Sequence, residues 1–176
     1  MHSIKKSILR VAVAVAMVFS AATFAEAQVV KGEKSVGPKV GYVSKNESAS
    51  AGLFFQYAFS EHFRIAPEIG YTFRHKDMDA FTFDINAHMP FGFTGEKVAF
   101  YPLAGLNYSS WNTHFIPQDM IEGDDVSSRT SRFGLNMGAG FELRCSATLK
   151  FTLEAKYCLI KDYSSAMIAA GISFVF

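Results

Sequence analysis

The sequence predicts an all-β protein: an eight-stranded antiparallel up-and-down transmembrane β-barrel preceded by a cleaved signal peptide. Three observations favour this fold class. Apolar and polar side chains alternate through eight separate segments of the 176-residue chain, as expected of strands whose successive side chains point to opposite faces. Glycines collect on the polar face of these segments. The chain also begins with a basic and then apolar run that is typical of secretion signals.

The N-terminus has the three parts of a secretory signal peptide. Lys5, Lys6 and Arg10 give it a basic start, residues 11–19 form an uninterrupted apolar run, and Ala25-Glu26-Ala27 offers the small residues that a signal peptidase requires. The apolar run is shorter than the roughly 20 residues that a membrane-spanning helix needs. This pattern favours a cleaved signal over an amphipathic N-terminal helix.

We therefore expect a signal peptide over residues 1–27, a short lead over 28–34 and one barrel domain over 35–176. Cleavage removes three basic residues and one acidic residue, which changes the formal net charge from +1 to −1. A chain with this charge lacks the basic surface that nucleic acids require, so we expect no nucleic acid partner.

The strands follow from a period of two in side-chain character, which is kept in phase through each segment. Helical spacing fits these segments less well. In the last of them, Ile168, Ala170, Ile172, Phe174 and Phe176 share one face. The eight predicted strands cover residues 36–43, 50–59, 63–73, 81–92, 98–109, 132–143, 149–159 and 165–176.

Alternation alone fits either a soluble barrel with apolar residues inside or a membrane barrel with apolar residues outside. Ten of the 13 glycines lie on the polar face of the strands, and 13 of the 18 phenylalanines lie on the apolar face. The interior of an eight-stranded barrel is narrow, so small residues relieve crowding there and many rings do not fit. The composition of the two faces thus predicts that the apolar face meets lipid.

Aromatic residues should form two girdles at the membrane interfaces. One girdle comprises Tyr42, Phe73, Phe81, Tyr108, Phe133 and Tyr157, and the other comprises Phe59, Phe63, Phe91, Phe100, Phe141 and Phe176.

Four prolines fall inside predicted strands, although proline cannot donate to a β-ladder. Pro38, Pro67, Pro90 and Pro102 all map to the half nearer the predicted periplasmic turns. We expect bulges or early strand ends near them, and a more regular ladder on the side of the third external loop. That loop is predicted over residues 110–130.

Several stretches resemble a known family. The chain looks like the small eight-stranded outer-membrane barrels of the OmpA/OmpX type, and more closely like the "porin family" barrel domains common in Bacteroidetes-like bacteria. The resemblance covers residues 34–176. It rests on the signal peptide followed by Gln28 and on the stretches FRIAPEIGYTF, FGLNMGAGFEL, FTLEAKY and GISFVF.

The resemblance implies a location and a set of partners. It implies a multi-pass protein of the Gram-negative cell outer membrane, in contact with outer-membrane lipid and lipopolysaccharide. The terminal GISFVF resembles the signal read by the barrel-assembly machinery, in which Gly171, Phe174 and Phe176 match, whereas Ala169 stands at the polar position. That machinery is therefore an expected partner during biogenesis.

The polar face carries charges of both signs, which should pair because a lone buried charge is costly. One interpretation is a satisfied polar network that fills the lumen; the other is a proton or ion path. The predicted network comprises Lys39, Arg64, Glu68, Asp84, His88, Arg132, Glu142, Lys150, Glu154 and Lys156.

Acidic residues cluster in the third external loop, at Asp119, Glu122, Asp124 and Asp125. Carboxylates at this density suit calcium, but their spacing matches no EF-hand loop. A solvated acidic loop, or one that contacts cations bridging lipopolysaccharide, is the other interpretation. An extracellular ligand of this loop is expected without being identified.

Cysteine and histidine offer little chemistry in this pattern. Cys145 and Cys158 bracket one strand and so lie roughly 40 Å apart at ~3.3 Å per residue, too far for a disulfide. His114 lies near Ser109 and Ser110, and His75 near Asp77, without the His-x-Ser pairing of barrel-type lipid A deacylases.

Three functions stay open at this point. The first is a non-enzymatic outer-membrane protein with a role in envelope integrity and with surface binding or adhesion through its external loop. The second is a narrow channel for ions or very small solutes. The third is a barrel-type lipid A-modifying enzyme. We expect no cofactor and no bound metal for the first of these.

Overall fold

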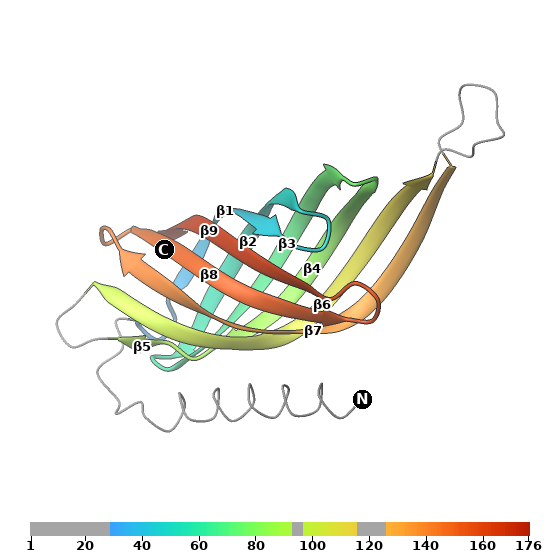
Figure 1. Ribbon diagram of the computed structural model, residues 1–176. Coiled ribbons are helices and arrows are strands. Elements are labelled where there is room, and N and C mark those ends of the chain that lie inside the picture. Colours follow the sequence, from blue (N-terminus) through green and yellow to red (C-terminus); the bar gives the residue numbers. More distant parts are fainter. Residues whose placement is uncertain (1–28, 93–96, 116–125) are drawn as a thin grey trace.

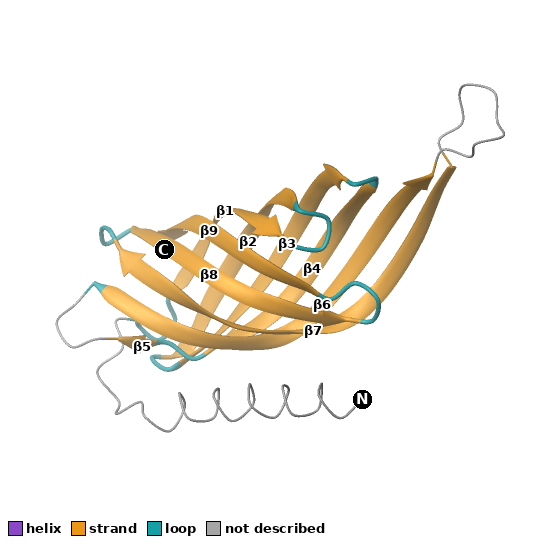
Figure 2. Ribbon diagram, in the orientation of Figure 1, coloured by secondary structure: helices purple, strands orange, loops and turns teal. Residues whose placement is uncertain are grey.

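A computed structural model describes residues 29–92, 97–115 and 126–176 of the chain. All the regular structure in these ranges is β-strand (Figures 1 and 2). The strands are β1 Lys34–Val43, β2 Ser48–Ser60, β3 Phe63–His75, β4 Met78–His88, β5 Phe91–Gly92, β6 Val98–Phe115, β7 Val126–Arg144, β8 Leu149–Ile160 and β9 Ser165–Val175.

The strands form one closed antiparallel barrel. Consecutive strands pair with each other except β4 and β5, β1 pairs with β9, and β4 pairs directly with β6. Strands β4 and β5 are two parts of one span, because both pair with β6 and only Met89 and Pro90 separate them. The predicted eight-stranded fold is therefore confirmed. Within the described ranges, no helix has the length and apolar character needed to cross a membrane.

The barrel has two distinct ends. The terminal end holds Lys34 and Phe176, whose backbones hydrogen-bond to each other, together with the β2–β3 and β7–β8 turns. The loop end holds the β1–β2, β3–β4, β6–β7 and β8–β9 connections. Strands β6 and β7 reach far beyond their neighbours at the loop end (Figure 1).

The apolar face points outward, as predicted. Large apolar side chains such as Leu106, Phe133 and Ile168 are exposed on the outer surface, whereas the residues between them are buried and mostly polar. Phe83 is 40% exposed and Phe151 is 38% exposed, which excludes the soluble barrel with these rings inside. The aromatic rings also touch between neighbouring strands: Phe100 and Phe141 lie 5.2 Å apart, centroid to centroid.

Inward glycines make room for the large polar side chains of the lumen. Gly140 lies beneath the ring of Tyr101, and a Cβ atom at this position would collide with that ring. Gly138 faces Lys156 across the β7–β8 ladder, and a Cβ atom there would collide with the Ala155 carbonyl oxygen and with Lys156 Cα. This arrangement explains why glycine collects on the polar face in a narrow barrel.

The ladders are interrupted at each of the four prolines, which confirms the predicted irregularity. Pro38 pairs with β2, but the β1–β9 ladder skips it; Pro67 pairs with β4, but the β2–β3 ladder skips it. Pro90 lies in the break between β4 and β5, and Pro102 pairs with β7 only. The β6–β7 ladder, which leads to the third loop, runs without interruption from Val98↔Leu143 to Phe115↔Val126.

The third external connection differs from the prediction. Residues 110–115 and 126–130, which were expected to be loop, belong to strands β6 and β7 of 18 and 19 residues. Alternation was hidden there because polar residues occupy both faces once the strands leave the lipid. The predicted absence of a disulfide is confirmed, since Cys145 and Cys158 are both free thiols.

Candidate functional site: the filled lumen and its two ends

Buried charges fill the terminal-end half of the lumen. Arg64 Nη1 forms an ion pair with Glu142 Oε2 at 2.5 Å, and the Lys150 ammonium bonds the same carboxylate at 3.2 Å. The Arg64 guanidinium also lies 4.6 Å from the Tyr101 ring centroid. The His88 ring stacks on the same Tyr101 ring, with the two centroids 4.5 Å apart. Charge pairing and stacking together satisfy groups that would be costly to bury alone.

The lead closes this end of the network. Glu33 bonds Lys150 at 2.9 Å and forms a second ion pair with Arg144. The lead backbone is held by β2, because Gly32 N donates to the Ala58 carbonyl oxygen and Ala58 N donates to that of Glu33. A carboxylate from outside the predicted barrel domain thus completes the lumen.

The middle of the lumen holds a chain of alternating charges. Lys39 Nζ lies 2.8 Å from Glu68 and 3.1 Å from Glu154. Lys156 Nζ lies 2.9 Å from the second oxygen of Glu68 and 2.7 Å from Asp84. These residues come from β1, β3, β4 and β8, so the chain ties opposite walls of the barrel together.

The network is electrically balanced within the described residues. Its cations are Lys39, Arg64, Arg144, Lys150 and Lys156, and its carboxylates are Glu33, Glu68, Asp84, Glu142 and Glu154. With five charges of each sign and a neutral His88, the net charge of the network is zero. Balance of this kind is what a low-dielectric interior requires.

One cluster in the lumen has the composition of a metal site. Ligand atoms of Glu68, His88 and Glu154 lie within 4.8 Å of one another. However, His88 Nδ1 accepts a hydrogen bond from Arg64 Nε at 3.1 Å, and a guanidinium only donates. The neutral ring therefore carries its proton on Nε2, which leaves no lone pair for a metal. The Lys39 ammonium, bonded to both carboxylates, already supplies the cation of this cluster.

An apolar cap closes the loop end. We call this group of residues the cap cluster: Val43, Ala80 and Trp111, packed against Met78, Tyr163 and Met167. The Trp111 and Tyr163 rings stack with centroids 5.2 Å apart. Tyr163 lies in the β8–β9 turn, so this turn covers the mouth of the barrel.

A second turn also folds over the loop end. Asn46, in the β1–β2 turn, is fully buried and donates to the carbonyl oxygens of Phe73 and Met78. Its own carbonyl oxygen accepts a hydrogen bond from His75 Nδ1 at 2.7 Å. The β1–β2 and β3–β4 turns are therefore joined across the mouth.

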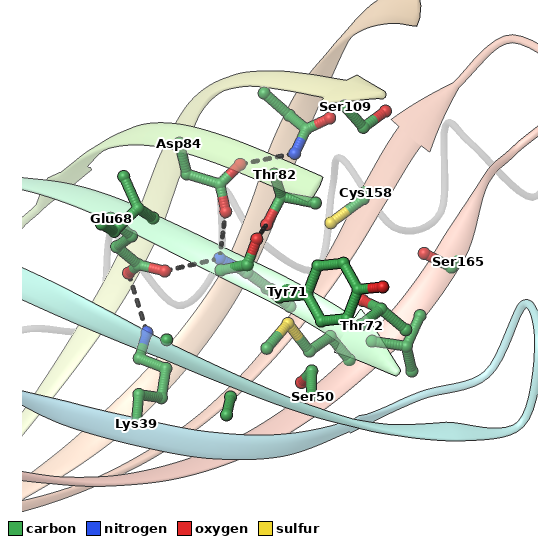
Figure 3. Close-up of a pocket in the computed structure, with 18 of the residues that line it drawn as sticks. Lys39, Ser50, Glu68, Tyr71, Thr72, Thr82, Asp84, Ser109, Cys158 and Ser165 are labelled. Atoms are coloured by element: carbon green, nitrogen blue, oxygen red, sulfur yellow. Dashed lines mark hydrogen bonds and ion pairs between the residues drawn. The ribbon is translucent and has the colours of Figure 1, made fainter. Parts of the chain in front are cut away.

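A small cavity of about 40 Å³ separates the charged network from the cap cluster (Figure 3). Lys39, Glu68 and Asp84 line one side, and Ser50, Thr72, Cys158 and Ser165 line the rest. Ser50 Oγ and Asn107 Oδ1 are buried there without a protein partner. The cavity has room for about two ordered waters, which suit such groups.

The structure brings together most of the residues predicted for the lumen. Arg132 is the exception: it is exposed at the loop end and donates to the Ser131 carbonyl oxygen. Strand β7 continues past the end of its neighbour β8, whose ladder stops at Gly134↔Ile160. Arg132 is therefore on the inward strand face but above the enclosed part of the lumen. The acidic residues Asp119, Glu122, Asp124 and Asp125 lie outside the described residues.

The residues of the expected assembly signal lie on both faces of β9 and at its end. Gly171 faces the lumen beside Phe54 and Thr152, whereas Phe174 and Phe176 are exposed outward. Their recognition by the assembly machinery stays a prediction.

Sequence reasoning missed three groups of polar residues. Tyr101 lies on the inward phase of its strand, but it carries no charge, so the charge pattern of that face does not mark it. Glu33 precedes the first alternating segment, so no pattern marked it. Asp79 and His114 form an ion pair of 2.9 Å on the outer surface near the loop end, in a segment that was expected to be loop.

A family model for the outer membrane protein beta-barrel domain matches residues 11–176. The chain belongs to this family. It is an outer-membrane β-barrel protein, located in the Gram-negative outer membrane, as the family and its solved structural neighbours indicate.

Solved structures share this fold at low sequence identity. The N-terminal β-barrel domain of Pseudomonas aeruginosa OprF superposes with a TM-score of 0.67 and 17% identity, covering 83% of this chain and 98% of that one. Neisserial surface protein A gives 0.63 and 16%, covering 82% and 96%. Ail, the attachment invasion locus protein of Yersinia pestis, gives 0.59 and 19%, covering 84% and 100%. A search of curated proteins finds no match.

Proposed function

We propose that this protein is a non-conducting, non-enzymatic barrel that supports the outer membrane and presents its β6–β7 hairpin to extracellular partners. The filled lumen supports the first half of this proposal. A permeating ion would have to break the ion pairs of Lys39 and Lys156 and then displace the Trp111–Tyr163 stack. Both barriers lie in series along one narrow path.

The projecting hairpin supports the second half. The β7–β8 ladder ends at Gly134↔Ile160, so residues 126–133 of β7 have no strand partner on that side within the described ranges. An unpaired strand edge offers a row of backbone donors and acceptors to another chain. In addition, a structure of Ail is described in complex with the heparin analogue sucrose octasulfate, which makes a sulfated glycan a reasonable first probe.

The enzyme alternative has one observation in its favour, the Asp79–His114 pair on the outer surface. Within the described residues, however, no serine or cysteine hydrogen-bonds to this pair: Ser110 Oγ accepts from Ser131 Oγ at 3.3 Å and does not donate to His114. This geometry favours the non-enzymatic proposal. Mass spectra of lipid A from cells with and without the protein should be identical.

Conductance tests the first half directly. The purified mature protein, inserted into planar bilayers, should show no stepwise ion conductance above the background of empty detergent. Reproducible single-channel steps would contradict the proposal and favour the narrow channel. A variant of the same protein with the cap opened, Tyr163→Ala, should also stay closed, because the charged network remains.

Surface binding tests the second half. Cells that display the wild-type protein should bind to heparin-coated surfaces more than cells displaying a variant in which Asn-Gly replaces residues 115–126. A two-residue turn of this type closes a β-hairpin, so the replacement keeps His114 opposite Ser127 and leaves the β4–β6 ladder intact. Equal binding by both strains at equal surface display would refute a role for the hairpin in binding this glycan.

A further inference from the structure

Five polar side chains form a connected group on the outer surface near the loop end. We call this group the rim cluster: Tyr71 of β3, Asp79 of β4, Asn112 and His114 of β6, and Arg129 of β7. The proposed function uses none of these side chains. They are also not part of the lumen.

The rim cluster faces outward, just beyond the aromatic girdle. Asp79 shares a strand face with Phe81, two residues away, and Arg129 shares a strand face with Phe133. Phe133 is 81% exposed, the largest value among the apolar side chains of the described barrel. Aromatic girdles mark the interface of an outer-membrane barrel, so the rim cluster lies at the level of the lipid headgroups.

Asp79 is the centre of the cluster and is already satisfied. It is buried despite facing outward. Tyr71 Oη and Asn112 Nδ2 donate to its Oδ2 at 3.1 and 3.0 Å, and His114 Nε2 bonds its Oδ1 at 2.9 Å. With three partners from strands β3 and β6, this carboxylate makes no ion pair with Arg129.

Asn112 links Asp79 to Arg129 and fixes the direction of the guanidinium. Its amide nitrogen donates to Asp79, so its oxygen is left to accept from Arg129 Nε at 3.0 Å. Arg129 thus has one edge anchored and its terminal nitrogens available. Within the described ranges, no ion pair joins Arg129 to an acidic side chain. A planar guanidinium fork of this kind suits a phosphate group.

We propose that the rim cluster binds a phosphate group of lipopolysaccharide in the outer leaflet. Arg129 contacts the phosphate, and Asn112 and Asp79 are positioning residues that hold Arg129 at headgroup height. The exposed Phe133 ring, nearer the middle of the membrane on the same strand, lies where the acyl chains of that lipid pass. The hairpin's proposed role in surface binding uses the backbone edge of residues 126–133, whereas this site uses the side chain of Arg129.

Binding of lipopolysaccharide to the purified full-length mature protein tests the proposal. Arg129→Gln should weaken binding about tenfold, the value of one charge-assisted hydrogen-bonded contact. The matched control is Arg132→Gln, which removes another exposed arginine, three residues away on the other strand face, and should leave the affinity unchanged. Both variants should keep the heat-modifiable migration of a folded barrel, and equal losses in both would overturn the site in favour of diffuse charge attraction.

The identity of the ligand is tested with two further probes. Lipopolysaccharide whose lipid A phosphates have been removed should bind wild type and Arg129→Gln equally. Vesicles of phosphatidylglycerol should compete poorly with intact lipopolysaccharide. If dephosphorylated lipopolysaccharide still distinguishes the two proteins, or if the vesicles compete as well as lipopolysaccharide, the assignment is wrong.

A double-mutant cycle tests the positioning role of Asn112. Asn112→Ala should weaken binding by about threefold in the wild-type background and should have no further effect in Arg129→Gln, because interacting residues are not additive. Additive losses would mean that Asn112 acts independently of Arg129, which would overturn its positioning role.

Discussion

The two halves of the lumen are closed by different physical means. From the terminal end to the middle, the lumen is filled by ion pairs, from that of Arg64 with Glu142 to those of Glu68 with Lys39 and Lys156, and these charges come from strands on opposite walls. The loop-end half is filled by the cap cluster, in which Trp111 stacks on Tyr163. The cavity of about 40 Å³ lies between them.

The difference teaches how a narrow barrel divides its tasks. Ion pairs and hydrogen bonds are directional, so the charged half specifies which residues face each other across the barrel. Removing one partner there leaves an uncompensated charge, which costs more than lost packing does. The cap cluster depends on turns, which can loosen locally without unpairing the ladders. The charged half should therefore dominate global stability, and the cap should mainly govern access to the cavity.

The largest expected effect follows from removing Glu68, which bridges Lys39 and Lys156. Glu68→Leu should lower the free energy of unfolding by about 3–5 kcal/mol, because two buried ammonium groups then share too few carboxylates. The measurement is denaturant unfolding of the refolded protein in lipid vesicles, followed by tryptophan fluorescence and heat-modifiability.

The neighbouring residue supplies the control for this prediction. Ile69 follows Glu68 in β3 and points to lipid. In Ile69→Ala, lipid acyl chains can fill the space left by the smaller side chain, because lipid is as apolar as the residue that is lost. It should cost clearly less than Glu68→Leu. Equal unfolding midpoints for the two variants would contradict the view that the charged half dominates stability.

The cap should respond more weakly and more locally. Tyr163→Ala removes the stack on Trp111, and an aromatic pair contributes about 0.5–1.5 kcal/mol beyond its buried area. Hydrogen exchange should rise in the β8–β9 turn and at Ser165, while β1 amides around Lys39 keep their protection. Faster exchange throughout the barrel would show that the two halves are not separable.

The sequence predicted these two halves unequally, for a physical reason. Inward charges such as Glu154 follow from strand phase alone, since a period of two assigns every residue to a face. The closure of the loop end depends on turns: Asn46 and Tyr163 reach the mouth by backbone paths that no periodicity describes. The same limit hid Glu33 in the lead. Arg132 was wrongly predicted to lie in the lumen, because the strand period assigns a side chain to a face but does not show where the neighbouring strand ends.

The rim cluster was hidden by a different effect. Beyond the lipid, neither strand face needs apolar residues, so the alternation that marks a strand disappears while the ladder continues. Asn112 and Arg129 are paired in register there, yet each looks like a loop residue in the sequence. Their partnership appears only when β6 and β7 are aligned.

The smallest expected effect concerns an exposed ion pair between two turns at the loop end, in contrast to the buried ion pairs of the lumen. Glu47 of the β1–β2 turn pairs with Lys76 of the β3–β4 turn at 2.5 Å, and about half of each side chain is exposed. The hydrogen bond and the charge of Lys76 lower the pKa of Glu47 below its usual value. Because folding lowers the pKa of Glu47, its ion pair with Lys76 stabilises the turns at pH values above the unfolded-state pKa. This stabilisation is lost as the pH falls through the folded-state pKa.

Glu47→Gln should therefore change little globally and should act in one pH window. Compared with wild type, the variant should show faster hydrogen exchange in residues 44–47 at neutral pH. The difference should vanish as the pH falls through the lowered folded-state pKa of Glu47, because the wild-type carboxyl then becomes protonated too. High salt should reduce the difference in the same way, since exposed pairs are screened. The buried Lys39–Glu68 pair is shielded from solvent and should resist such salt. A salt-independent difference for Glu47→Gln would mean that this tie resembles the buried pairs, and the contrast between exposed and buried ties in this barrel would fail.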